Sequence, residues 1–108
     1  MLKVALVQLR TGTDVERNVH IAEELISKAS TKGAKLVVTP EMTSLLDRRP
    51  GELDKKIQTE EQDFALSRFR KLAKETQCCL VVGSLPIKIE SGQAVNRSFC
   101  IDNAGRVV

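Results

Sequence analysis

The sequence predicts an α/β fold in which a mixed β-sheet carries helices on one face. Short, unalternated apolar runs, typical of strands that are buried on both faces, alternate with longer segments of helical periodicity. The order of strand, helix, strand, helix and then two or three strands fits a mixed sheet. Each helical apolar stripe is narrow, so the helices are expected to cover one face of the sheet only.

The first strand and the first helix are predicted within the first 33 residues. The continuous apolar run Val4–Val7 predicts a buried strand. Thr13 and Glu16 have the spacing of a capping box, which predicts that a helix starts at Thr13. Apolar residues then recur at steps of three and four as far as Ala29, and Gly33 provides a C-terminal stop.

The second strand and the second helix follow. Leu36–Val38 completes a β-α-β unit, whose strands should be parallel with a right-handed crossover. Pro40 has no amide hydrogen and should end the strand. Residues 47–51 have the composition of an exposed loop. Thr59–Gln62 repeats the capping-box pattern and predicts a helix that ends near Thr76.

The remaining residues predict a hairpin. Cys79–Val82 forms a third buried strand that runs on through Leu85, and residues 86–92 are predicted to turn the chain. Ala94–Asp102 should form a fourth strand, and Arg106–Val108 the beginning of another. Because the sequence stops on these first strand residues, we expect residues 1–108 to be the N-terminal segment of a longer single domain.

Composition excludes several classes of protein. The net charge of +3 comes from scattered residues, and there is no Trp or Tyr, so a nucleic-acid partner is not expected. No apolar run is long enough for a signal peptide or a membrane span, so a cytoplasmic location without a membrane partner is predicted. The odd count of three cysteines, without a C-x-x-C motif and with a single histidine, predicts neither disulfides nor a metal site.

One carboxylate, Glu41, is notable for its position directly after the second strand. Functional groups gather where the carboxyl ends of parallel strands meet, and Pro40 fixes the backbone just before this acid. A carboxylate that is partly desolvated at such a rim is suited to act as a general base. A solvated acid at the start of a loop has the same spacing, so position alone leaves both interpretations open.

The cysteines are interpreted as packing residues. Cys78 and Cys79 come at the amino end of the third strand, the wrong end to meet Glu41 if the strands are parallel. Cys100 lies inside an apolar strand, and free cysteines are commonly buried.

Three further polar residues are given structural interpretations. His20 falls on the polar side of the first helix, where it should be solvated. Ser84 follows a glycine but lacks the G-x-S-x-G spacing of a serine nucleophile. The amide of Asn96 could bridge neighbouring loops.

Four segments together point to a known family. They are KVALVQL (Lys3–Leu9), NVHIAEELISKASTKGAKLVVTPE (Asn18–Glu41), LVVGSLPIK (Leu80–Lys88) and NRSFCIDNAGRVV (Asn96–Val108). Their content and order resemble the N-terminal part of the carbon–nitrogen hydrolases, the nitrilase superfamily. The resemblance implies an αββα sandwich, of which this chain would form the N-terminal portion. It also implies a homo-oligomer.

The resemblance further implies a Glu-Lys-Cys mechanism that needs no cofactor or metal. In the family, the glutamate is the base for a cysteine thiol that attacks a small amide or nitrile, and the lysine stabilises the oxyanion. Only Glu41 matches this triad; the lysine and cysteine motifs are expected beyond Val108, so the 108 residues alone should be inactive. Thr39 stands where many members have an aromatic residue, and a threonine at this position is similar to a group of amidase-like members.

Two other hypotheses stay open. The chain could be a truncated, non-catalytic member that self-associates or binds a partner through an uncovered apolar sheet face. A small nucleotide-binding domain is a third possibility, although residues 10–13 supply only one glycine for a phosphate-binding turn.

Overall fold

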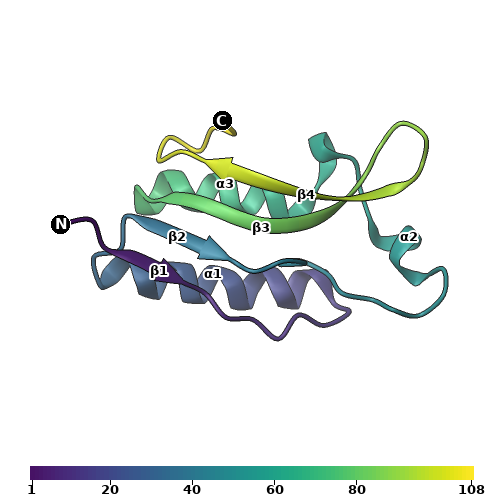
Figure 1. The fold of residues 1–108 in the computed structure, drawn as a ribbon, viewed down its shortest axis with the longest axis horizontal. Coiled ribbons are helices and arrows are strands. Elements are labelled where there is room, and N and C mark those ends of the chain that lie inside the picture. The colour runs from purple at the N-terminus through teal and green to yellow at the C-terminus, as the bar shows by residue number, and fades with distance from the viewer.

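The computed structural model describes all residues from 1 to 108 and contains one four-stranded sheet, in the order β1-β2-β3-β4 (Figure 1). The elements in chain order are β1 (Val4–Leu6), α1 (Val15–Thr31), β2 (Leu36–Thr39), α2 (Glu52–Lys56), the 3-10 helix η1 (Glu60–Gln62), α3 (Phe64–Thr76), β3 (Cys79–Lys88) and β4 (Ala94–Ile101). No helix combines the length and the apolar character that a membrane crossing requires.

The sheet is mixed, as predicted. β2 pairs in parallel with both β1 and β3, while β3 and β4 form an antiparallel hairpin. The two long helices, α1 and α3, lie side by side on the same face of the sheet (Figure 1). The predicted parallel β-α-β unit and the single helical layer are therefore confirmed.

The core lies between this helical layer and one face of the sheet. The predicted helical stripes provide its helical side, including Val19 and Ile26 from α1 and Phe69 from α3, all fully buried. The sheet contributes alternate strand residues such as Val37 and Leu80. The apolar residues that repeat along each helix and each strand therefore lie on the face that points into the core, as the sequence indicates.

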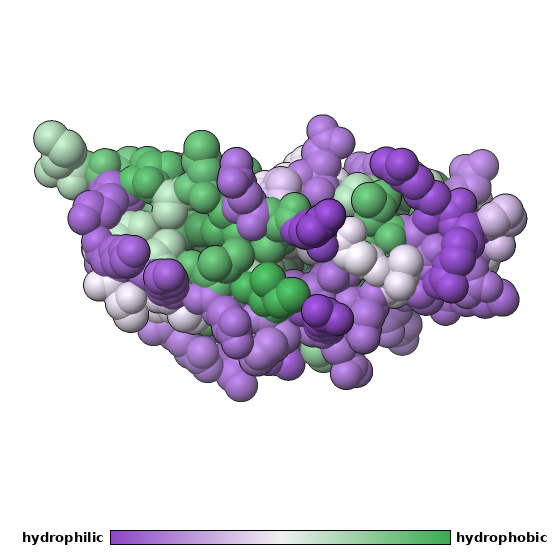
Figure 2. Space-filling view, turned by 90° about the horizontal axis from the view of Figure 1, so that it is seen from below, coloured by the Kyte–Doolittle hydropathy of each residue, from purple (hydrophilic) through white to green (hydrophobic).

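The opposite face of the sheet is not covered by any element of the chain. Its residues are the outward members of the same strands, here called the open face: Val4, Leu6, Leu36, Val38, Cys79, Val81 and Cys100. Leu6 is 77% exposed and Val4 is 48% exposed. Seen from the side of β1 and α1, hydrophobic residues form a band above a largely hydrophilic surface (Figure 2).

Both predicted helix starts are wrong, and in each case an aspartate replaces the expected threonine cap. α1 begins at Val15, where the Asp14 carboxylate accepts the amide hydrogen of Arg17 at 3.2 Å. α3 begins at Phe64, where Asp63 accepts the amide hydrogen of Leu66 at 2.9 Å. Aspartate caps as well as threonine does, and its charge also interacts favourably with the helix dipole.

The predicted end of β3 is also wrong, because the strand continues past Pro86 to Lys88. Pro86 pairs with Asn96 of β4, while β2 pairs with β3 only as far as Val82. At Pro86 the edge of β3 that faces β2 is therefore unpaired with β2, so the missing amide hydrogen of the proline removes no hydrogen bond between these two strands. The hairpin tip at Gly92 lies where it was expected, with its amide bonded to the Ile89 carbonyl.

The chain end largely agrees with the prediction. β4 stops at Ile101, one residue earlier than expected. A turn at Gly105 follows, and Val107 then forms an antiparallel bridge with Ile101. These last residues thus begin a further strand beside β4.

Candidate functional site

Glu41 follows β2 directly, at the edge of the sheet where the parallel strands β1, β2 and β3 point their carboxyl ends. The side chain is exposed, and its carboxylate makes no hydrogen bond or ion pair within the chain. The neighbouring Pro40 and Met42 are half-buried. The expected partial desolvation of Glu41 is therefore not found, because the chain packs around the backbone of this turn but not over its carboxylate.

The turn that carries Glu41 is attached to β3 through one residue, Ser84. The Met42 amide donates to Ser84 Oγ at 2.8 Å, and the Thr43 amide donates to the Ser84 carbonyl at 3.0 Å. Met42 has a left-handed backbone with φ of 50°, which costs a non-glycine residue about 1–2 kcal/mol. Contacts to the two residues after Glu41 thus hold the backbone in a conformation that it would not adopt freely.

A buried relay of hydroxyl groups holds the same turn from inside. Thr39 and Thr43 are almost fully buried, and their Oγ1 atoms lie 2.9 Å apart. The Thr43 hydroxyl donates to the Pro40 carbonyl, so the Thr39 hydroxyl is the donor to Thr43. Thr39 Oγ1 also accepts a long hydrogen bond of 3.4 Å from the Gly83 amide. The relay links β3 to the carbonyl just before Glu41.

Gly83 allows the turn to approach β3 closely. A Cβ atom at this position would lie 2.4 Å from the Pro40 carbonyl carbon and 2.5 Å from the Thr39 oxygen. Contacts this short are to backbone atoms, which cannot swing aside as a flexible side chain can. The sequence therefore needs glycine at Gly83 for the turn to occupy its position.

A buried amide, Asn18, connects the site to the start of α1. Its Nδ2 donates to the Gly12 carbonyl at 2.8 Å and to the Ser44 carbonyl at 2.9 Å, while its Oδ1 accepts the Gly12 amide hydrogen at 3.0 Å. A cavity of about 100 Å³ lies beside it, lined partly by Thr43 and residues 8–11. Asn18 thus joins the β1–α1 loop to the loop that follows Glu41.

An ion cluster around Asp47 fixes the far end of this loop. Arg49 donates to both carboxylate oxygens of Asp47, and Lys56 Nζ lies 2.8 Å from Oδ2. Hydrogen bonds from Arg49, and then from Lys56, hold the pKa of the Asp47 carboxyl well below its ordinary range. Lys56 also donates to the Thr13 carbonyl at 2.7 Å, which ties the cluster to the residues before α1.

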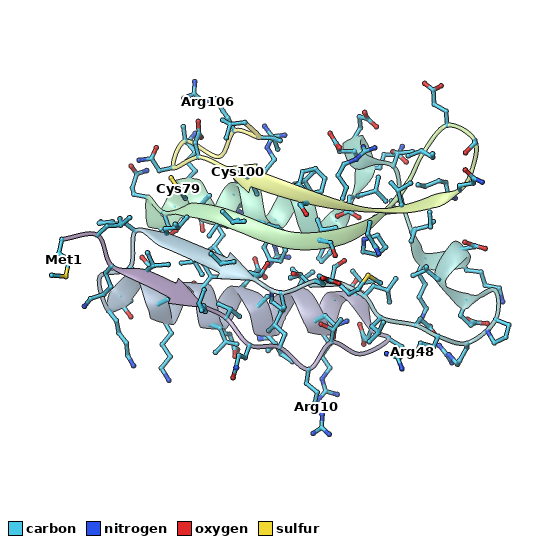
Figure 3. All side chains as sticks on the ribbon, in the orientation of Figure 1. Met1, Arg10, Arg48, Cys79, Cys100 and Arg106 are labelled. Carbon is cyan, nitrogen blue, oxygen red and sulfur yellow. The ribbon has the colours of Figure 1, made fainter.

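The cysteines lie away from Glu41. Cys78 is fully buried, so its predicted packing role is confirmed. Cys79 pairs with Leu36 at the amino end of β3, opposite to the edge that carries Glu41. Cys100 is exposed on the open face of β4, so the prediction that it packs within the chain is wrong (Figure 3).

The remaining candidates have no part in the site. His20 is exposed on α1, as predicted, and its Nε2 lies 2.8 Å from a carboxylate oxygen of Glu24, which is exposed as well. Asn96 is exposed on β4 and makes no side-chain hydrogen bond, so the expected bridge between loops is absent. No three His, Cys, Asp or Glu side chains lie close enough together to hold a metal ion.

The sequence predicts the position of Glu41 after a strand but does not single out the residues that hold its turn. These are Asn18, Thr43 and Asp47, together with Ser84, whose spacing was relevant only to a serine nucleophile. The available signal was the presence of small polar residues next to apolar strand ends, where a buried polar group must find a partner.

Comparisons with known proteins identify the family of this chain. The family model described as carbon–nitrogen hydrolase matches residues 3–108. The chain belongs to the carbon–nitrogen hydrolase family. It is 32% identical, over its whole length, to nitrilase homolog 2 of Dictyostelium discoideum, of which it covers 33%.

Solved structures share the fold. The NitFhit protein of C. elegans superposes with a TM-score of 0.84 at 23% identity, over 99% of this chain and 27% of that one. A cysteine-to-alanine variant of the amidase from Nesterenkonia sp. AN1, in complex with butyramide, gives a TM-score of 0.80 at 28% identity, over 99% of this chain and 41% of the amidase. The sheet with one helical layer is thus part of a nitrilase fold. The chain spans about a third of its full-length curated relative.

Proposed function

We propose that this chain carries the general base, Glu41, of a carbon–nitrogen hydrolase that converts a small carboxamide into an acid and ammonia. The observation that carries the proposal is the fixed turn after β2. It holds a free carboxylate at the carboxyl edge of the parallel strands, in a chain that the family model matches almost end to end. Other exposed acids such as Glu61 and Glu90 are also unpaired, so the support comes from the held backbone of the turn and its place at this edge of the sheet.

In this mechanism, Glu41 takes the proton from a cysteine thiol as the sulfur attacks the amide carbon. The tetrahedral oxyanion is stabilised by a lysine, and the C–N bond then breaks. Ammonia leaves with the proton that Glu41 returns. Water hydrolyses the resulting thioester, with Glu41 again acting as base.

The 108 residues alone should not catalyse this reaction. Neither the lysine nor the cysteine of the triad is matched by a residue here: Cys79 is at the opposite edge of the sheet, and Cys100 is on the open face. Glu41 is also solvated, whereas a general base works best when other groups cover it and exclude water. The nucleophile and the cover would have to come from outside these residues.

An amide is favoured over a nitrile as substrate. The support is the likeness, at 28% identity, to an amidase whose variant was solved with butyramide. A cytoplasmic location is also proposed, because all three cysteines are free, as is usual in a reducing compartment.

The test compares residues 1–108 with the product of the complete reading frame that contains them, by measuring ammonia release from short aliphatic amides. We expect activity only in the latter, and Glu41→Gln should lower kcat by roughly 10²–10⁴-fold. Glu90→Gln, which changes an exposed acid in the β3–β4 hairpin, is the matched control and should have no effect. Hydrolysis that survives Glu41→Gln would refute the assignment.

The open face favours a second candidate function, self-association of a non-catalytic chain. Leu6, Val38 and Val81 form a continuous apolar row across three strands on this face. Sedimentation of residues 1–108 would then show a dimer that Leu6→Lys converts to a monomer. A wild-type chain that sediments as a monomer at all concentrations tested excludes this candidate.

A further inference from the structure

The third strand, β3, contains an irregularity directly beside the Glu41 turn. Val82 pairs with Phe99 and Leu85 pairs with Arg97, so Gly83 and Ser84 together face a single residue of β4. This is the geometry of a β-bulge, which re-aims a side chain relative to the regular alternation of the strand. Ser84 is buried, at 5% exposure, in phase with the inward-facing Leu80 and Val82, and the bulge shifts the alternation from Leu85 onward.

We propose that Ser84, which lies in this bulge, is a positioning residue for Glu41; this inference rests on the proposed function of Glu41 as the base. Ser84 does not contact the Glu41 side chain. It acts through the backbone, because its hydroxyl accepts the Met42 amide and its carbonyl accepts the Thr43 amide. One residue of β3 therefore holds the two residues that follow Glu41.

The remaining geometry makes the placement of Glu41 depend on this attachment. The carboxylate has no partner of its own, so only its backbone can fix it. Pro40 restricts the chain on one side, and Met42 is held left-handed on the other. Without the Ser84 hydroxyl, Met42 loses an acceptor and can relax to an ordinary conformation, which would rotate the direction in which Glu41 projects.

The neighbouring strand offers a matched control, Ser98. It is the residue of β4 that faces the bulge, and its hydroxyl donates to the Gly83 carbonyl at 2.6 Å. Ser98→Ala removes a hydroxyl and a hydrogen bond from the same bulge without touching the Glu41 turn. A general loosening of the hairpin would affect both variants, whereas positioning predicts an effect of Ser84→Ala alone.

The first experiment measures amide hydrogen exchange by NMR on residues 1–108. In Ser84→Ala, the Met42 amide should exchange about tenfold faster or more, since its acceptor is gone. The Val37 and Leu80 amides in the core should not change. Ser84→Thr retains the hydroxyl and should restore slow exchange, and Ser98→Ala should leave Met42 as it is.

Two results of this experiment would overturn the proposal. One is unchanged exchange at Met42 in Ser84→Ala, and the other is faster exchange by the same factor at Val37 and Leu80, which would make Ser84 a general stabiliser of the sheet. If Ser84→Ala does not fold, Ser84→Cys, which keeps the volume but accepts hydrogen bonds weakly, is judged by the same criteria.

The second experiment uses the product of the complete reading frame. Ser84→Ala should lower kcat for amide hydrolysis on the order of tenfold to a hundredfold with little change in KM, because the base is displaced but substrate contacts remain. If Glu41→Gln abolishes hydrolysis while Ser84→Ala leaves kcat intact, the positioning role is wrong. If Glu41→Gln leaves hydrolysis intact, the proposed function fails, and Met42 exchange still decides whether Ser84 holds the turn.

Discussion

Replacing Gly83 by alanine should destabilise the chain far more than a single methyl group normally does. The added Cβ would lie 2.4 Å from the Pro40 carbonyl carbon and 2.5 Å from the Thr39 oxygen. Ordinary contacts between such atoms are about 3.5 Å, so the turn must move away by roughly 1 Å. Overpacking of this kind costs about 1–3 kcal/mol.

The same movement would stretch the hydrogen bonds that cross between the turn and β3. The Met42–Ser84 and Thr43–Ser84 hydrogen bonds measure 2.8 and 3.0 Å, so a shift of roughly 1 Å would stretch them beyond hydrogen-bonding distance. Losing them costs about 1 kcal/mol each. The total is about 3–5 kcal/mol, which is a large share of the 5–15 kcal/mol that stabilises a typical domain.

Urea unfolding of residues 1–108, followed by circular dichroism, measures this loss. The control is Gly92→Ala at the hairpin tip, where φ is 86° but no atom lies within 4 Å of the added Cβ. That variant carries only the backbone strain of about 1–2 kcal/mol. If Gly83→Ala is no more destabilising than Gly92→Ala, the close approach of turn and strand does not have the importance argued above.

Three further predictions concern the core, the amide clamp and the ion cluster. Phe69→Ala should lower the free energy of unfolding by about 3–5 kcal/mol, because Phe69 is fully buried between helix and sheet; Lys71→Ala on the exposed side of α3 should have almost no effect in the same urea titration. Asn18→Ala should cost about 2–3 kcal/mol, since it leaves the buried Ser44 carbonyl and the half-buried Gly12 amide without their Asn18 partner, and a loss below 0.5 kcal/mol in urea would contradict this. The pKa of Asp47 is lowered in the folded chain, so its contribution to stability is fully present above the ordinary aspartate range and is lost as the pH falls toward the folded-state pKa. Thermal unfolding between about pH 5 and pH 2 should therefore show a steeper loss for the wild type than for Asp47→Asn, and parallel curves would refute the assignment.

The elements that could be predicted are those whose information is local. The apolar runs at Leu36–Val38 and Cys79–Val82 predicted strands correctly, although this chain covers only one face of them, and the stripes of α1 and α3 defined one inner face each. The helix starts were missed because two acceptable caps lie close together in each case, and sequence spacing does not show which one the tertiary structure selects. The extension of β3 through Pro86 depends on where β2 ends, which is information from another strand.

The candidate site divides in the same way. Glu41 could be found because its position after a strand and a proline is a local feature. The residues that hold it could not, since Ser84 is 42 positions from Met42 and Asn18 is 26 positions from Ser44. Ser84 also lies in a bulge that shifts the alternation of β3 from Leu85 onward, and no local pattern in the sequence predicts that shift.

The contrast between the backbone and the side chain of Glu41 is the strongest physical argument for a function at this position. Asp47, Asp63 and Asp102 all use their carboxylates within the chain, to bind basic groups, to cap a helix or to close a turn. At Glu41 the chain instead holds Met42 in a costly left-handed conformation, places a glycine at Gly83 and buries a hydroxyl relay, yet the carboxylate gains no internal contact. A strained backbone that is kept although the side chain makes no stabilising contact is characteristic of functional sites. An unpaired carboxylate on a fixed backbone is what the proposed base requires, with a thiol and a desolvating cover supplied from outside these residues.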